Sequence, residues 1–130
     1  MNNNNSRNNN SVNSASNIVK FLFTLQIAVK MFHWQTRSYA VHIETGQLFG
    51  KIVDLTDDII EQYMGVYGRP RMNSNASITI PNMTKSAMVS MLRDGMTYLS
   101  RRMPRDTHIQ NLRDELAGAM AKALYLLTMS

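Results

Sequence analysis

The chain has 130 residues, a net charge of +5 and no cysteine. This length suits one domain with a modest core, and the lack of cysteine excludes disulfides, thiolate metal sites and thiol chemistry. The sequence shows no hydrophobic leader and no apolar run approaching the length of a bilayer span, so we expect a soluble, intracellular protein without a membrane partner.

Residues 1–17 consist almost entirely of asparagine and serine, with Arg7 as their one charged side chain. Such a segment has no apolar period and nothing to bury. We therefore predict a disordered tail over residues 1–17 and a folded domain over residues 18–130.

The first helix is predicted from a cap at Ser16 or Asn17 through Phe32. One side of it carries a core stripe: Ile18, Leu22, Leu25, Val29 and Phe32. A second apolar stripe points roughly the opposite way: Val19, Phe23, Ile27 and Met31. Only one side of a helix can face the inside of a four-helix bundle, so the second stripe predicts a subunit interface and a homo-oligomer.

The second helix is predicted over residues 39–64, which lack proline and repeat apolar residues at helical spacing. Measured around the axis from His42, Asp57 lies at roughly 60° and Glu61 at roughly 100°. Asp58 lies at roughly 160° and faces outward, which makes it the poorer ligand candidate. Asp57 and Glu61 are one turn apart on one flank, where together they can hold one cation.

The spacing along this helix decides how a metal could be shared. His42 and Asp57 are separated by about 22 Å along the axis, whereas a metal–ligand bond is about 2 Å long. One chain therefore cannot bring both to one ion. Two copies with antiparallel second helices can, because His42 of one then faces Asp57 and Glu61 of the other, giving two equivalent sites per dimer.

The remaining chain predicts two more helices. Residues 68–82, rich in Asn, Ser, Arg and Pro, read as a long connection, as expected if the second and third helices run parallel. Thr84 is the predicted cap of the third helix, Pro104 ends it, and Asp106 or Thr107 caps the fourth. The predicted fold is all-α, a four-helix bundle with a long connection between helices two and three.

The pair His33-Trp34, followed by a helix carrying His42, Asp57 and Glu61, resembles the signature of the Dps-type mini-ferritins. The whole pattern is also similar to small uncharacterised ferritin-like proteins of tailed phages and large DNA viruses. This resemblance implies a ferritin-like bundle and an iron-oxidising (ferroxidase) site between subunits. It assigns His33 and His42 to one subunit as iron ligands, and Asp57 and Glu61 to the other.

The chain departs from that family at two points. The family motif has a further acidic ligand one turn after its second histidine, where this chain has Gly46, and the stretch between His33 and His42 is shorter. Glu44 lies at about 200° and faces the wrong way to replace the acid. Two hypotheses stay open. The first is an Fe(II)-oxidising enzyme, and the direction in which His42, Asp57 and Glu61 face on the helix favours it. The second is a non-catalytic, self-assembling protein associated with the virion or with nucleic acid, and Gly46 favours it.

Four arginines form a weaker candidate site. Arg101, Arg102 and Arg105 cluster at the turn between helices three and four, and Arg37 is predicted at the same end of the bundle. Such a patch suits the nucleic-acid backbone, and because no base-reading motif is present, the contact would be sequence-independent. In the viral setting we expect the protein in the virion or in the cytoplasm of the infected host.

Overall fold

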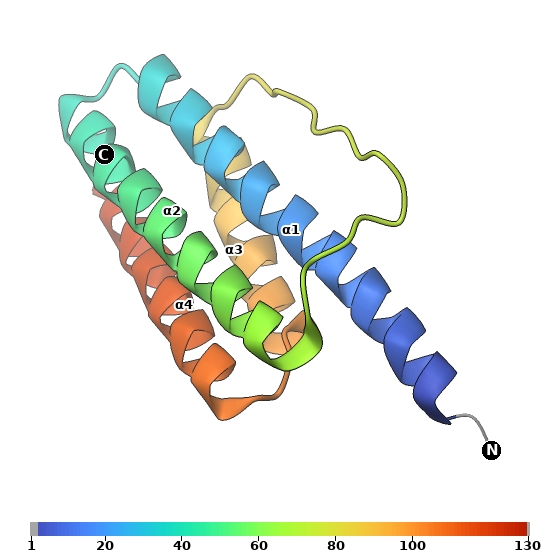
Figure 1. The fold of residues 1–130 in the computed structure, drawn as a ribbon. Coiled ribbons are helices and arrows are strands. Elements are labelled where there is room, and N and C mark those ends of the chain that lie inside the picture. The colour runs from blue at the N-terminus through green and yellow to red at the C-terminus, as the bar shows by residue number, and fades with distance from the viewer. Residues whose placement is uncertain (1–2, 130) are drawn as a thin grey trace.

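The computed structural model describes residues 3–129, and the side chains of residues 15–129. The described chain forms four helices: α1 (Asn3–Gln35), α2 (Tyr39–Tyr67), α3 (Lys85–Arg102) and α4 (Thr107–Leu127). The all-α fold is confirmed. Figure 1 shows the helices packed alongside one another, with one long connection crossing the bundle between α2 and α3.

The topology follows from the lengths of the connections. The turns between α1 and α2 and between α3 and α4 are short, so each pair is antiparallel. The long segment between α2 and α3 returns the chain to the other end, and these two helices run in the same direction (Figure 1). α1 packs against α2 and α3, and α4 packs against the same two helices.

The core lies between the helices, where the apolar stripes meet. The predicted inner face of α1 is buried at each of its positions: Ile18, Leu22, Leu25, Val29 and Phe32. The other helices contribute side chains that are at most 1% exposed: Ile52, Ile59, Met88, Leu92, Leu99, Ile109, Leu116 and Met120. Burial of these apolar side chains is the main stabilising term of the fold.

The outer stripe of α1 remains partly uncovered. Phe23 is 48% exposed, and Val19, Ile27 and Met31 are half-buried. On α2, Val53 is exposed and Phe49 and Ile60 are half-buried. The outer face shared by α1 and α2 therefore carries apolar side chains that the single chain does not fully bury.

The starts of α2 and α3 and the end of α2 follow local signals in the sequence. The Ser38 side chain accepts the Val41 N–H at the start of α2, and Thr84 does the same for Ala87 at the start of α3. Gly68 ends α2 with φ +88°, a left-handed conformation that suits glycine because it has no Cβ.

The start of α1 differs from the prediction. The helix begins at Asn3 and not at Ser16 or Asn17. Once a packed segment has nucleated a helix, each further residue adds one backbone hydrogen bond, so the helix can extend beyond the segment that packs. The predicted disordered tail is not tested, because it falls mainly on residues 1–14, whose side chains lie outside the described part.

The expectation that no segment is long and apolar enough to cross a membrane is corrected at α1. Among the described residues, Ala15–Gln35 passes that test by length and composition. A helix in the core of a bundle passes it too, and α1 packs here against α2 and α3 through its buried stripe. The sequence does not show a continuous apolar run here, because Lys20 and Lys30 interrupt it.

Asp106 occupies the N-cap position of α4 but makes no side-chain cap hydrogen bond. Its carboxylate instead accepts a hydrogen bond from the Tyr67 hydroxyl, which joins the end of α2 to the start of α4. This hydrogen bond, with burial and the negative charge of Asp106, raises the pKa of Tyr67 to about 12.

We expect this link to weaken in alkaline solution. The pKa of Tyr67 is higher in the folded chain (about 12) than the ordinary value of 10.0, so its contribution to stability is complete below pH 10 and is lost as the pH approaches 12. Urea unfolding between pH 9 and 12 should therefore show a steeper loss of stability in the wild type than in Tyr67→Phe. Equal slopes in the two proteins would contradict the assignment, and Tyr39→Phe, exposed at the opposite end, is the control.

Candidate metal site

His33 and His42 lie against each other at the junction of α1 and α2. Their rings are stacked, with centroids 3.9 Å apart and an interplanar angle of 15°. The hydrogen bonds are reciprocal: His33 Nδ1 is 2.6 Å from the His42 carbonyl oxygen, and His42 Nδ1 is 2.8 Å from the His33 carbonyl oxygen. The short connection between the two histidines thus brings them together.

The reciprocal bonds fix the position of the ring protons. A carbonyl oxygen only accepts hydrogen bonds, so each Nδ1 must carry the hydrogen that it donates. The Thr45 hydroxyl, 3.4 Å from His33 Nδ1, is compatible with this because it donates to the Val41 carbonyl at 2.7 Å. When either imidazole is neutral, its lone pair is therefore on Nε2, the arrangement usual in metal-binding histidines whose other nitrogen donates to the backbone.

Gly46 lies directly beside the His33 ring. A Cβ added at this position would be 3.0 Å from Cε1 and 3.3 Å from Nδ1 of His33. The position where the resemblance implies an acidic ligand thus lies against an imidazole ring, and a side chain at this position would require that ring to shift.

The candidate acidic ligands lie in the second half of α2. Asp57, Asp58 and Glu61 each offer a carboxylate oxygen, and these oxygens lie within 4.8 Å of one another. All three side chains are exposed. Asp57 and Glu61 are grouped as predicted, and Asp58, which the angular argument set aside, joins them because exposed side chains three residues apart on a helix can converge.

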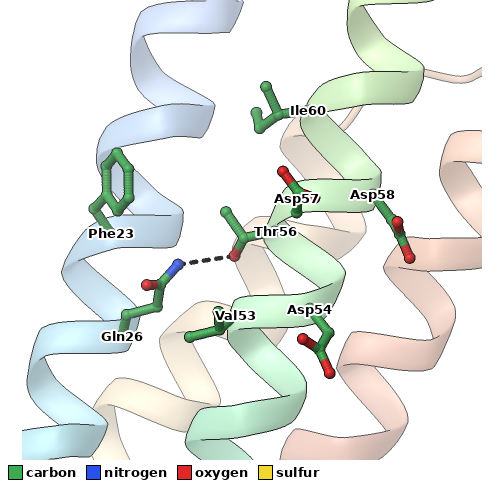
Figure 2. Close-up of a pocket in the computed structure, with 8 residues that line it drawn as sticks. All are labelled: Phe23, Gln26, Val53, Asp54, Thr56, Asp57, Asp58 and Ile60. Carbon is green, nitrogen blue, oxygen red and sulfur yellow. Dashed lines mark hydrogen bonds between the residues drawn. The ribbon is translucent and has the colours of Figure 1, made fainter.

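Asp57 and Asp58 of the acidic cluster border a shallow hollow of about 730 Å³ between α1 and α2. Figure 2 shows Phe23 and Gln26 on the α1 side, and Asp54 and Asp58 extending from α2 away from α1. Gln26 Nε2 donates to Thr56 Oγ1 at 3.0 Å across the floor of the hollow.

The two parts of the candidate site do not meet within one chain. His42 lies in the first turns of α2 and Asp57 in its second half, and α2 is one uninterrupted helix, so the two remain about 22 Å apart along its axis. Both parts of the candidate site lie on the outer face formed by α1 and α2. His33 of α1 contacts His42 of α2. Gln26, two helical turns earlier on α1, lies beside the acids.

Lys30 lies on this same face, between the two groups. Its Nζ is 4.5 Å from the centre of the Phe49 ring and 5.5 Å from that of Trp34, a cation–π arrangement. Trp34 is 64% exposed, so it is not a core residue.

The predicted grouping of the arginines is wrong at Arg37. Gln35, next to the α1–α2 turn, bonds to Asn82 and Met83 at the start of α3, whereas Arg101 lies at the far end of that helix. Arg37 is therefore at the opposite end of the bundle. The error came from placing both short turns at the same end, although parallel α2 and α3 put them at opposite ends (Figure 1).

The end that carries Arg101, Arg102 and Arg105 instead receives the end of α2. The contact between Tyr67 and Asp106 brings the start of the long connection to the α3–α4 turn, and Arg69 follows two residues after Tyr67. All four arginines are exposed, and none forms an ion pair within residues 15–129.

Sequence reasoning proposed the histidines and two of the acids as ligands, which stays a prediction, and missed their surroundings. It treated Gly46 as the loss of a ligand, although its position one helical turn after His42 could have suggested a space for a ring. Asp58 has a signal too, because it lies three residues before Glu61. The stacking of His33 has no sequence signal, since it depends on the conformation of residues 36–38.

Comparison with known proteins identifies a family and a phage relative. Residues 33–127 match a family of unknown function, DUF5856, and the chain belongs to this family. The chain is 28% identical over 120 residues to the "Uncharacterized 14.6 kDa protein in mobD-ri intergenic region" of Enterobacteria phage T4, an alignment that covers 88% of each chain. No solved structure matches.

Proposed function

We propose that the bundle is of the ferritin-like type and that two copies associate through the outer face of α1 and α2 to bind and oxidise Fe(II). Each ion lies between the histidine pair His33 and His42 of one copy and Asp57 and Glu61 of the other. Because the two stacked rings are nearly parallel, each lone pair lies in its own ring plane, and one imidazole of the pair serves each ion. The observation that carries the proposal is the paired histidine geometry, in which both Nδ1 atoms donate to the backbone and both Nε2 atoms are left as ligands.

The acids support the proposal by their chemistry and position. Imidazole and carboxylate together suit Fe(II), and carboxylates offset the charge of the cation. The acidic cluster lies on the same face as the histidines at a distance that one chain cannot close, so a second copy in antiparallel orientation supplies what each copy lacks.

The midpoint between the two groups is suited to a close approach of two helices. Gly50 lies halfway between His42 and the Asp57–Glu61 pair. A Cβ at Gly50 would meet nothing within 4 Å. A glycine at the crossing point lets two helix backbones approach closely, and exposed Phe23 and Val53 supply apolar contact beside it.

In this function Fe(II) is the substrate. With hydrogen peroxide as oxidant, two Fe(II) ions each give up one electron, two protons are taken up and the O–O bond breaks, which leaves two Fe(III) ions and two waters. The imidazoles set the geometry of the bound ion, and the acids stabilise the higher charge of the product.

The test combines mass and metal binding on the full chain. Light scattering should give the mass of a dimer or a multiple of it, and anaerobic titration should saturate at about one Fe(II) per chain. Addition of peroxide should then produce ferric absorbance. A monodisperse monomer would contradict the shared site, and a dimer that binds no Fe(II) would contradict the metal function.

A second candidate is sequence-independent contact with nucleic acid, the non-catalytic alternative. The observation favouring it is the exposed group Arg69, Arg101, Arg102 and Arg105 at one end of the bundle. Binding to duplex DNA that weakens as salt rises, and that is lost in Arg101→Glu/Arg102→Glu, would support it. Binding unchanged by these substitutions, or no binding in low salt, would contradict it.

A further inference from the structure

We propose that Gly46 is a positioning residue for the two histidines. Without a side chain at this position the His33 ring can lie flat against His42 with Nδ1 bonded to the backbone. Each ring then keeps its Nε2 lone pair available to a first-row divalent metal ion. We use the name histidine clasp for His33, His42 and their two reciprocal hydrogen bonds.

The His33 ring is restrained on three sides, by His42, by its hydrogen bond and by Gly46. One face of its ring lies on His42 at 3.9 Å, and its Nδ1 is tied to the His42 carbonyl at 2.6 Å. The ring edge that carries Cε1 and Nδ1 faces Gly46. A displacement away from position 46 must therefore disturb the stacking, lengthen the hydrogen bond or do both.

A methyl group at position 46 is enough to force that displacement. Its Cβ would be 3.0 Å from Cε1, whereas unstrained carbon contacts are about 3.5–4.0 Å long. Release of Nδ1 from its acceptor removes the constraint on the tautomer, and the proton of a neutral imidazole can then occupy either nitrogen. The Nε2 lone pair is no longer guaranteed, so metal affinity should fall.

The clasp belongs to one chain, since both histidines and both acceptors lie within it. Its use as a metal ligand rests on the proposed function, but its tautomeric state is a property of the metal-free chain. The two can therefore be tested separately. Imidazole ligands favour Fe(II), Co(II), Ni(II) and Zn(II) over Mg(II) or Ca(II), so Co(II) is a suitable coloured probe.

The experiment compares Gly46→Ala and Gly46→Val with Gly118→Ala. Gly118 is an exposed glycine of α4 whose added Cβ would meet nothing within 4 Å, so it controls for the gain in helix propensity. Long-range ¹H–¹⁵N spectra at pH 8, where ordinary imidazoles are neutral, report which ring nitrogen carries the proton. Visible absorption on titration with Co(II) reports the affinity of the imidazole site.

We expect both histidines of the metal-free wild type and of Gly118→Ala to carry the proton on Nδ1. In Gly46→Ala the His33 signals should change to mixed tautomers, and Co(II) affinity should fall about 10- to 100-fold, the usual cost of losing the partner that orients a metal-binding histidine. Gly46→Val should show a larger effect. A merely structural role for Gly46 would leave the tautomers unchanged in every variant that folds.

Two results would overturn the inference: mixed tautomers in the wild type, or an unchanged His33 tautomer in both Gly46 variants. A third result separates the inference from the function. If the tautomers behave as expected but the wild type binds no Co(II), the metal function fails while the positioning role of Gly46 stands.

Discussion

Asp57→Ala/Glu61→Ala should abolish Fe(II) binding and with it the oxidation of Fe(II) by peroxide. Removing a single group that only orients a metal ligand costs about 10- to 100-fold in affinity, and here two of the ligands themselves are removed. We expect at least a 100-fold loss, roughly 2.7 kcal/mol of binding free energy or more. Fluorescence-detected Fe(II) titration and ferric absorbance measure the two effects.

The stability of the bundle should change little in this variant. All three acids of the cluster are exposed, and neither Asp57 nor Glu61 forms an ion pair within the described side chains. Glu44→Ala/Asp54→Ala is the matched control, because it removes the same charge from the same helix outside the cluster. If the control loses as much activity as the test variant, the effect is one of general charge and the assigned acids are not ligands.

Gly50→Arg should convert the assembly into folded monomers and eliminate Fe(II) oxidation. In the proposed dimer each Gly50 faces its copy close to the two-fold axis, so two arginines would meet there with like charge and no room. The single chain tolerates the change, since a Cβ at Gly50 meets nothing within 4 Å and arginine favours a helix more than glycine does.

Sedimentation velocity and thermal unfolding together measure this outcome. We expect a smaller sedimentation coefficient with an unfolding temperature that is set by the monomer alone. Gly118→Arg makes the same change on exposed α4 and should leave the association intact. A Gly50→Arg protein that remains a dimer would place the interface elsewhere and remove the basis of the shared site.

The parts of the fold that depend on local pattern were predictable. The buried stripe of α1 follows from helical periodicity. The cap of α3 at Thr84 and the end of α2 at Gly68 follow from the chemistry of those residues. The start of α1 was not predictable, because propensity alone does not show how far a nucleated helix extends.

The candidate site also has parts that were predictable from the sequence and parts that were not. The facing of Asp57 and Glu61 is a property of one helix and could be calculated from the sequence. The stacking of His33 on His42 depends on a turn and on the space at Gly46, and neither can be calculated from periodicity. Arg37 was misplaced because its position depends on the topology of the whole bundle.

The central claim is that each metal ion is held by two copies of the chain, and co-expression of two inactive variants tests it most directly. One variant is His33→Ala/His42→Ala and the other is Asp57→Ala/Glu61→Ala. In a mixed dimer one site lacks all four ligands, whereas the other receives intact histidines from one copy and intact acids from its partner.

Random pairing gives mixed dimers in half of the assemblies, each with one of two sites intact, so the account predicts recovery of about a quarter of the wild-type rate of Fe(II) oxidation. Each variant expressed alone should be inactive. A mixture that stays as inactive as its components, although mixed dimers are isolated by two different affinity tags, would contradict the account.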